Sequence, residues 1–189
     1  MSGDILTNIM SEAVKSLLER ASIARRDHRQ ADAKDDLVEA VRLSRQLHSR
    51  AELVQSLKAL GQIERDLNNV EAARSHYEEA VVICREGSDS LQLAHTVRHL
   101  GDVYQHAGRV DLAEPCFNEA LDIYRREEKT HDLDLANAIR PLALLKESVG
   151  DAAAAAPLWQ EARALYKSLG IQEGVSECSK HLAALGSGE

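Results

Sequence analysis

Apolar residues recur every three or four positions along most of the chain, with polar and charged residues between them. This spacing places the apolar side chains on one face of an α-helix and the polar side chains on the opposite face. Short clusters of Gly, Asn, Asp and Ser interrupt the pattern. It predicts an all-α protein of about nine helices, at residues 5–27, 30–48, 50–67, 70–86, 90–107, 110–127, 132–149, 152–169 and 172–185.

The chain repeats itself. Stretches that begin at Leu53, Leu93 and Leu135 align, the second 40 residues and the third 42 residues after the one before. The same residue types return at five positions of each copy, namely Leu60, Leu100 and Leu142; Gly61, Gly101 and Ala143; Ala73, Ala113 and Ala155; Tyr77, Phe117 and Trp159; and Ala80, Ala120 and Ala162. A fainter copy precedes them, with Leu17, Ala21, Ala33, Leu37 and Ala40, and a half copy with Leu182 and Ala183 follows.

The repeated residues suit a pair of antiparallel helices. Small residues such as Gly61 and Gly101 let the second helix approach the first, and the aromatic ring fills the space that they leave. One such pair cannot bury its apolar face alone, so neighbouring copies must stack.

This pattern resembles the tetratricopeptide repeat, and its long spacing is similar to that of kinesin light chain repeats. The resemblance implies a right-handed superhelical α-solenoid of antiparallel helix pairs that forms one domain over residues 1–189. Its repeats would span about residues 14–48, 53–87, 93–128 and 135–169, with a capping helix at about 172–185. It also implies a concave groove, lined by the first helices, that holds a peptide or protein segment.

The composition argues against some classes of partner. The chain has 189 residues, a formal net charge of −8 and a pI of about 5.5, which argues against a nucleic-acid ligand. The three cysteines, Cys84, Cys116 and Cys178, form no paired motif and are expected to be reduced thiols. There is no apolar stretch of membrane-spanning length and no signal-peptide pattern at the N-terminus. We therefore expect a cytoplasmic protein without a membrane or nucleic-acid partner, as a monomer or weak homo-oligomer.

Carrying the repeat along the chain predicts the groove residues, which are Lys58, Gln62, Arg65, His95, Arg98, Asp102, Asn137, Arg140 and Lys180. Lys58, Arg98, Arg140 and Lys180 share one repeat position and would form a basic stripe. Such a stripe could clamp acidic side chains or a terminal carboxylate through charge-assisted hydrogen bonds. The alternative is an ordinary solvated face whose cations pair with neighbouring Asp and Glu.

A row of histidines offers a second hypothesis. His95, His99, Asp102 and His106 follow one another at helical spacing, and two histidines four residues apart can bind Zn²⁺. The alternative is a polar groove lining or a pH-sensitive contact. No adjacent copy supplies a matching cluster, so neither a metal site nor any cofactor is expected.

The sequence carries no P-loop, GxGxxG, HExxH or GxSxG motif, and no enzyme activity is predicted. We expect a protein–protein interaction scaffold that binds an acidic segment in its groove. Two alternatives stay open: a ligand- or metal-responsive regulatory domain, based on the histidine row and on Pro141 within a predicted helix, and self-assembly through the end helices.

Overall fold

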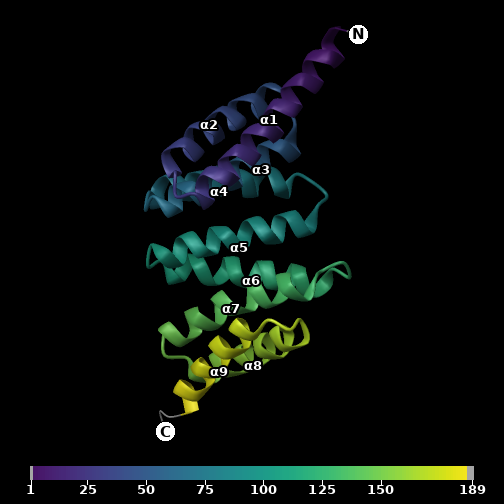
Figure 1. Ribbon diagram of the computed structural model, residues 1–189. Helices are drawn as coiled ribbons and strands as arrows, with labels where there is room; N and C mark the ends of the chain where they lie inside the picture. Colours follow the sequence, from purple (N-terminus) through teal and green to yellow (C-terminus); the bar gives the residue numbers. More distant parts are fainter. Residues whose placement is uncertain (1, 187–189) are drawn as a thin grey trace. The chain divides into compact units, whose positions relative to one another are not determined.

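The computed structural model describes residues 2–186, with side chains from residue 5 onward, and within them it is all α-helical (Figure 1). Residues 1 and 187–189 of the predicted domain lie outside this part. The described part holds nine helices, as predicted: α1 (Ser2–Arg26), α2 (Gln30–Gln46), α3 (Arg50–Asp66), α4 (Val70–Arg85), α5 (Ser90–His106), α6 (Val110–Arg126), α7 (Asp132–Ser148), α8 (Ala152–Ser168) and α9 (Gln172–Gly186).

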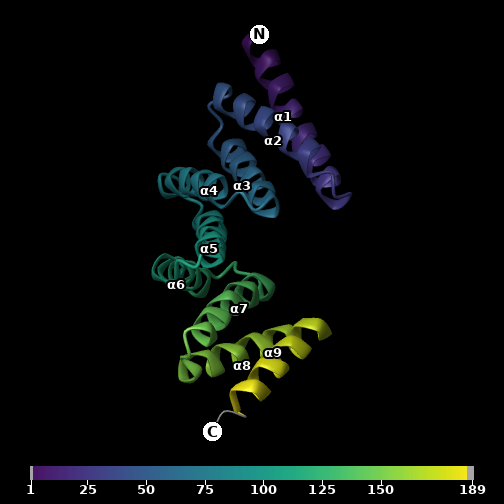
Figure 2. The same cartoon turned by 90° about the vertical axis from the view of Figure 1, so that its left-hand side faces the viewer.

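Contacts between the helices divide the chain into two compact units. Unit 1, Met1–Ser88, contains α1 to α4, and unit 2, Asp89–Glu189, contains α5 to α9. Within each unit every helix packs against the next one in the chain, and consecutive helices run antiparallel (Figures 1 and 2). The first helices of successive pairs also touch, α1 with α3 and α5 with α7. The predicted array of sequential helix pairs is confirmed.

Two glycines allow the close approach that the repeat requires. A Cβ atom on Gly61 of α3 would lie 2.8 Å from the ring of Tyr77 on α4, and one on Gly101 of α5 would lie 2.6 Å from the ring of Phe117 on α6. Both rings are buried, and so are the equivalent Ala143 and Trp159 of α7 and α8. The small residue and the aromatic ring are therefore complementary in α3–α4 and in α5–α6, as predicted.

The last helix makes a glycine–ring contact with the helix that precedes it, which the sequence comparison did not predict. A Cβ atom on Gly174 of α9 would lie 2.5 Å from the ring of Tyr166 on α8. Val175, Leu182 and Leu185 of α9 pack against the core of unit 2. Thus α9 is docked by specific contacts to α8.

Residues of several types end the helices. His48 and Asn68, which follow α2 and α3, have positive φ angles of 51° and 60°, and Gly108 has the same left-handed conformation after α5. Pro141 lies within α7, which is helical from Asp132 to Ser148. Among the described helices, none combines the length and the apolar character that crossing a bilayer requires.

Candidate functional site

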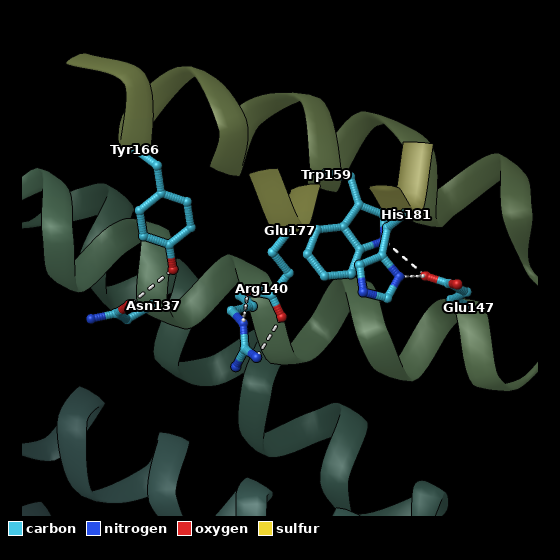
Figure 3. Close-up of polar contacts among 7 residues, drawn as sticks. All are labelled: Asn137, Arg140, Glu147, Trp159, Tyr166, Glu177 and His181. Carbon is cyan, nitrogen blue, oxygen red and sulfur yellow. Dashed lines mark hydrogen bonds and ion pairs between the residues drawn. The ribbon is translucent and has the colours of Figure 1, made fainter. Parts of the chain in front are cut away.

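In unit 2 the predicted groove residues lie on α5, α7 and α9, the first helices of the helix pairs. We call the surface formed by these helices the first-helix face. In unit 1 the corresponding surface is formed by α1 and α3. Arg140 of α7 is bound by Glu177 of α9 (Figure 3). Arg140 Nε and Nη2 donate hydrogen bonds of 2.8 and 2.6 Å to the two carboxylate oxygens. This bidentate geometry is the strong form of a charged hydrogen bond. The bond to Arg140 lowers the pKa of Glu177 and raises the pKa of Arg140.

Asn137 lies one turn before Arg140 on α7. The hydroxyl of Tyr166 donates a 3.0 Å hydrogen bond to Asn137 Oδ1 (Figure 3). Burial raises the pKa of Tyr166, so the phenol stays protonated and can donate this bond. The bond fixes the amide so that its NH₂ group is left for other acceptors.

Arg98 of α5 occupies the same repeat position as Arg140. Its side chain is 15% exposed, with Nη2 2.9 Å from His99 Nε2 and Nη1 3.6 Å from Asp102 Oδ2. Tyr124 of α6, which corresponds to Tyr166 of α8, interacts with Arg98. The equivalent tyrosines thus differ in their partner on the first helix, because Tyr124 interacts with Arg98 whereas Tyr166 is bonded to Asn137.

These contacts show which cations of the predicted basic stripe lie beside acidic groups. Arg98 and Arg140 each face a carboxylate of the same chain, as the alternative interpretation expects of a paired face. Lys180 of α9 is exposed and lies near Glu177. Lys58 is half-buried on α3 and belongs to unit 1. Arg140 and Lys180 therefore lie beside acidic groups.

The first-helix face of unit 1 carries a hydrogen-bonded chain of polar side chains. Arg65 Nη2 donates to Gln62 Oε1, and Gln62 Nε2 donates to Asp66 Oδ1, both over 2.9 Å. Arg25 of α1 donates to Asp66 Oδ2 over 2.5 Å. Burial raises the pKa of Asp66, but the bonds from Arg25 and Gln62 outweigh burial and hold it below its ordinary value.

The histidine row does not converge on one point. The rings of His95 and His99 meet edge to face, with centroids 4.6 Å apart, and His99 Nδ1 lies 3.1 Å from Asp102 Oδ2. His106 is exposed at the end of α5. Within residues 5–186, no three His, Cys, Asp or Glu side chains are grouped as a metal ion would require. The row lines the first-helix face with polar groups.

One polar cluster was not predicted. His181 of α9 stacks on the buried Trp159 of α8, with ring centroids 4.2 Å apart and planes 9° from parallel. Glu147 Oε2 of α7 accepts from Trp159 Nε1 over 3.0 Å and lies 2.8 Å from His181 Nδ1 (Figure 3). Sequence reasoning assigned Trp159 to packing alone, because the repeat pattern does not show that His181 of α9 and Glu147 of α7 meet at its ring.

Comparison with known proteins identifies the family to which this repeat is similar. Two family models, both described as tetratricopeptide repeat, match residues 53–87 and 91–168, and no enzyme family matches. A search of curated proteins by sequence finds no match.

Solved structures with the same fold share little sequence with the chain. A putative kinesin light chain repeat protein of Podosopora anserina has a TM-score of 0.71 at 16% identity, over 92% of this chain and 95% of that one. A Rap protein complexed with Competence and Sporulation Factor has a TM-score of 0.83 at 16% identity, over 95% of this chain. A signal transduction ATPase of Pyrococcus horikoshii with a tetratricopeptide repeat sensor has a TM-score of 0.81 at 13% identity, over 91% of this chain.

The chain spans half of the Rap protein and 26% of the ATPase. The similarity to kinesin light chain repeats that the spacing indicated is confirmed for the fold. The two family models together cover more than half of the sequence, and their boundaries follow the repeats found by self-comparison. This chain belongs to the tetratricopeptide repeat family.

Proposed function

We propose that the chain is a protein-interaction module that binds an acidic peptide segment on its first-helix face. The observation that carries the proposal is the arrangement around Arg140. Glu177 uses Nε and Nη2 of the guanidinium, which leaves the N–H donors of Nη1 for a ligand. The side chain is 42% exposed, so a ligand can reach it.

The neighbouring groups favour an extended polar ligand. Asn137 keeps its amide donors while Tyr166 holds its oxygen, and Lys180 adds an exposed ammonium on α9. Because in-chain partners already orient Arg140 and Asn137, binding would immobilise few additional side chains. Tetratricopeptide repeats generally bind proteins, and the structurally similar Rap protein is complexed with Competence and Sporulation Factor.

Charge reversal on this face tests the proposal. Peptides selected on the wild-type protein from a displayed library would be measured by fluorescence anisotropy against a Lys58→Glu, Arg98→Glu, Arg140→Glu variant. We expect acidic peptides to be selected and their affinity to fall more than tenfold in the triple variant. Circular dichroism would first show that both proteins are equally helical.

The chain offers a matched control. Arg125 of α6 is 46% exposed and pairs with Glu161 over 2.7 Å, so it resembles Arg140 but lies on a second helix. Arg125→Glu should leave peptide affinity unchanged. Equal binding by the wild-type protein and the triple variant would place the ligand elsewhere, and selection of basic peptides would contradict the proposed ligand class.

Self-association is the second candidate function, and one observation favours it. Ile5 and Ile9 lie one turn apart near the start of α1 and are 61% and 59% exposed. A helix face with several exposed aliphatic side chains is typical of a protein contact. Sedimentation velocity over a hundredfold range of concentration, with Ile9→Asp as the comparison, would show whether two copies associate through α1.

A further inference from the structure

Unit 1 contains a cavity of about 500 Å³ between α2, α3 and α4. Leu60 and Glu64 of α3 line it, four residues apart and therefore on one face of the helix. Gln62 of the first-helix face lies between them in sequence and projects from the other side of α3. The cavity is thus separate from the peptide site proposed above.

The exposed surface of its walls is mainly apolar, although Arg42, Arg45 and Gln46 of α2 also line it. Val41 and Leu60 are buried, while Val38 on α2 is 51% exposed at the margin. Small-molecule sites in proteins typically combine such walls with a few polar groups in a cavity of about 300–1,000 Å³. This cavity has that size and that composition.

Glu64 supplies the first polar group. It is 3% exposed and is the buried charged residue of the described core. Lys34 Nζ lies 2.9 Å from Oε1, and Asn69 Nδ2 donates to Oε2 over 2.8 Å. Burial raises the pKa of Glu64, but these bonds outweigh it and hold the pKa below its ordinary value. A carboxylate has about four acceptor positions, so these two bonds leave capacity for a further donor.

His76 of α4 supplies the second polar group. Burial is the main cause that lowers its pKa, and Arg45 and Lys34 add to it; together they outweigh Glu64 and Glu79, so the imidazole is neutral at pH 7. A neutral imidazole offers one donor and one acceptor nitrogen. Within residues 5–186 we find no hydrogen bond to His76, although it lines the cavity.

The corresponding positions of unit 2 carry different residues. Asn118 stands in place of Val38, Leu158 in place of His76 and Lys146 in place of Glu64. Leu158 packs against the core of unit 2. The combination of apolar walls, carboxylate and imidazole is therefore particular to unit 1 and is not a requirement of the repeat.

We propose that this cavity binds a small uncharged amphipathic molecule. Its aliphatic body would lie against Val38, Val41 and Leu60, and one hydroxyl or amide group would donate to Glu64 or His76. The charges support an uncharged ligand, because the charged residues that line the cavity are already paired, Glu64 with Lys34, Arg42 with Glu39 and Arg45 with Glu79. A charged ligand would find no unpaired countercharge here and would lose its hydration on entry.

The test uses 1-hexanol as the probe and NMR of a protein with labelled Val and Leu methyl groups. We expect saturable shift changes at Val38, Val41 and Leu60. Hexanoate, which carries a charge, should bind at least tenfold more weakly. Tighter binding of hexanoate than of hexanol would overturn the assignment of an uncharged ligand.

Substitutions taken from the chain itself complete the test. His76→Leu and Val38→Asn introduce the residues that unit 2 tolerates, and each should weaken hexanol binding at least fivefold. Val82 of α4 is 58% exposed, so Val82→Asn is a matched control and should leave binding unchanged. Shift changes that do not saturate, or that persist in both cavity variants, would overturn the site, whatever the outcome for peptide binding.

Discussion

Lys34 of α2 and Glu64 of α3 form an ion pair, and the equivalent positions of unit 2 carry the same pair with its charges exchanged. Lys34 Nζ lies 2.9 Å from Glu64 Oε1, and Lys146 Nζ of α7 lies 2.5 Å from Glu114 Oε1 of α6. Each pair joins the second helix of one repeat to the first helix of the next. Exchanging the partners would place like charges together, so the reversed polarity distinguishes the two junctions.

The Lys34–Glu64 pair gives a first prediction. Lys34→Met leaves the carboxylate of Glu64 buried without its cation and should destabilise the protein by roughly 1–3 kcal/mol, because an uncompensated buried charge is costly and Lys34 is only partly buried. The exchanged pair Lys34→Glu, Glu64→Lys should recover most of that loss, as Glu114 and Lys146 show that the geometry accepts it. Urea unfolding of Lys34→Glu, of Glu64→Lys and of the double variant measures this coupling, and additive effects would contradict it.

Packing at the small residues gives a second prediction. Gly101→Ala places a methyl group 2.6 Å from the Phe117 ring, so α5 and α6 must separate. Overpacking of this kind typically costs about 1–3 kcal/mol, more than alanine gains by its helix propensity. Gly186→Ala is the control, since its Cβ would meet open space. A stability in thermal unfolding equal to that of wild type would show that the ring moves aside freely.

The repeat made much of the fold predictable. Gly61 with Tyr77 and Gly101 with Phe117 recur at fixed spacing, so the helix pairs and their closest contacts followed from self-comparison. The pairing of Arg140 did not follow, because it depends on Glu177 in the half copy at α9. The burial of Glu64 was not predictable either, because the equivalent position is Tyr104 or Lys146 in other copies and so shows no common residue type. Contacts between repeats, unlike those within them, need coordinates.

The turns give a third prediction. His48 has a φ of 51°, a conformation that strains a residue with a Cβ atom by about 1–2 kcal/mol, whereas glycine adopts it freely. His48→Gly should therefore stabilise the protein by about 0.5–1 kcal/mol after the greater freedom of glycine in the unfolded chain is allowed for. The reverse change at the equivalent turn, Gly170→Ala, should destabilise it similarly, since Gly170 has a φ of 72°. The midpoints of urea unfolding check both signs.

The single tryptophan gives a fourth prediction. Trp159 is buried beneath His181, and its indole N–H is bonded to Glu147. His181→Ala should expose the indole ring, shift its fluorescence to longer wavelength and lower the protection of α9 amides from hydrogen exchange. Lys180→Ala, one residue earlier and exposed, is the control. Unchanged fluorescence in His181→Ala would mean that α8 and α9 bury the ring without the imidazole.

The last prediction concerns pH and follows from His76. Burial holds its pKa in the folded protein below the ordinary value, whereas in the unfolded chain a histidine titrates near pH 6.5. Between those two pKa values the unfolded state binds more protons, so stability rises with pH. As the pH falls, the contribution of neutral His76 is lost progressively from about pH 6.5 until its folded pKa is passed, and then the loss levels off.

The variant His76→Leu isolates this effect from the other histidines. Urea midpoints of the wild-type protein and the variant, measured from pH 7.5 to pH 5, should diverge as the pH falls, with the wild type losing stability faster. Glu64, Asp66 and Glu177 have lowered pKa values, so their contributions are present above the ordinary pKa of a carboxyl group and are lost at more acid pH. The three carboxyl groups therefore change the stability at a lower pH than His76 does. Parallel curves for the two proteins would show that the pKa of His76 is the same in the folded protein as in the unfolded chain, and would contradict this prediction.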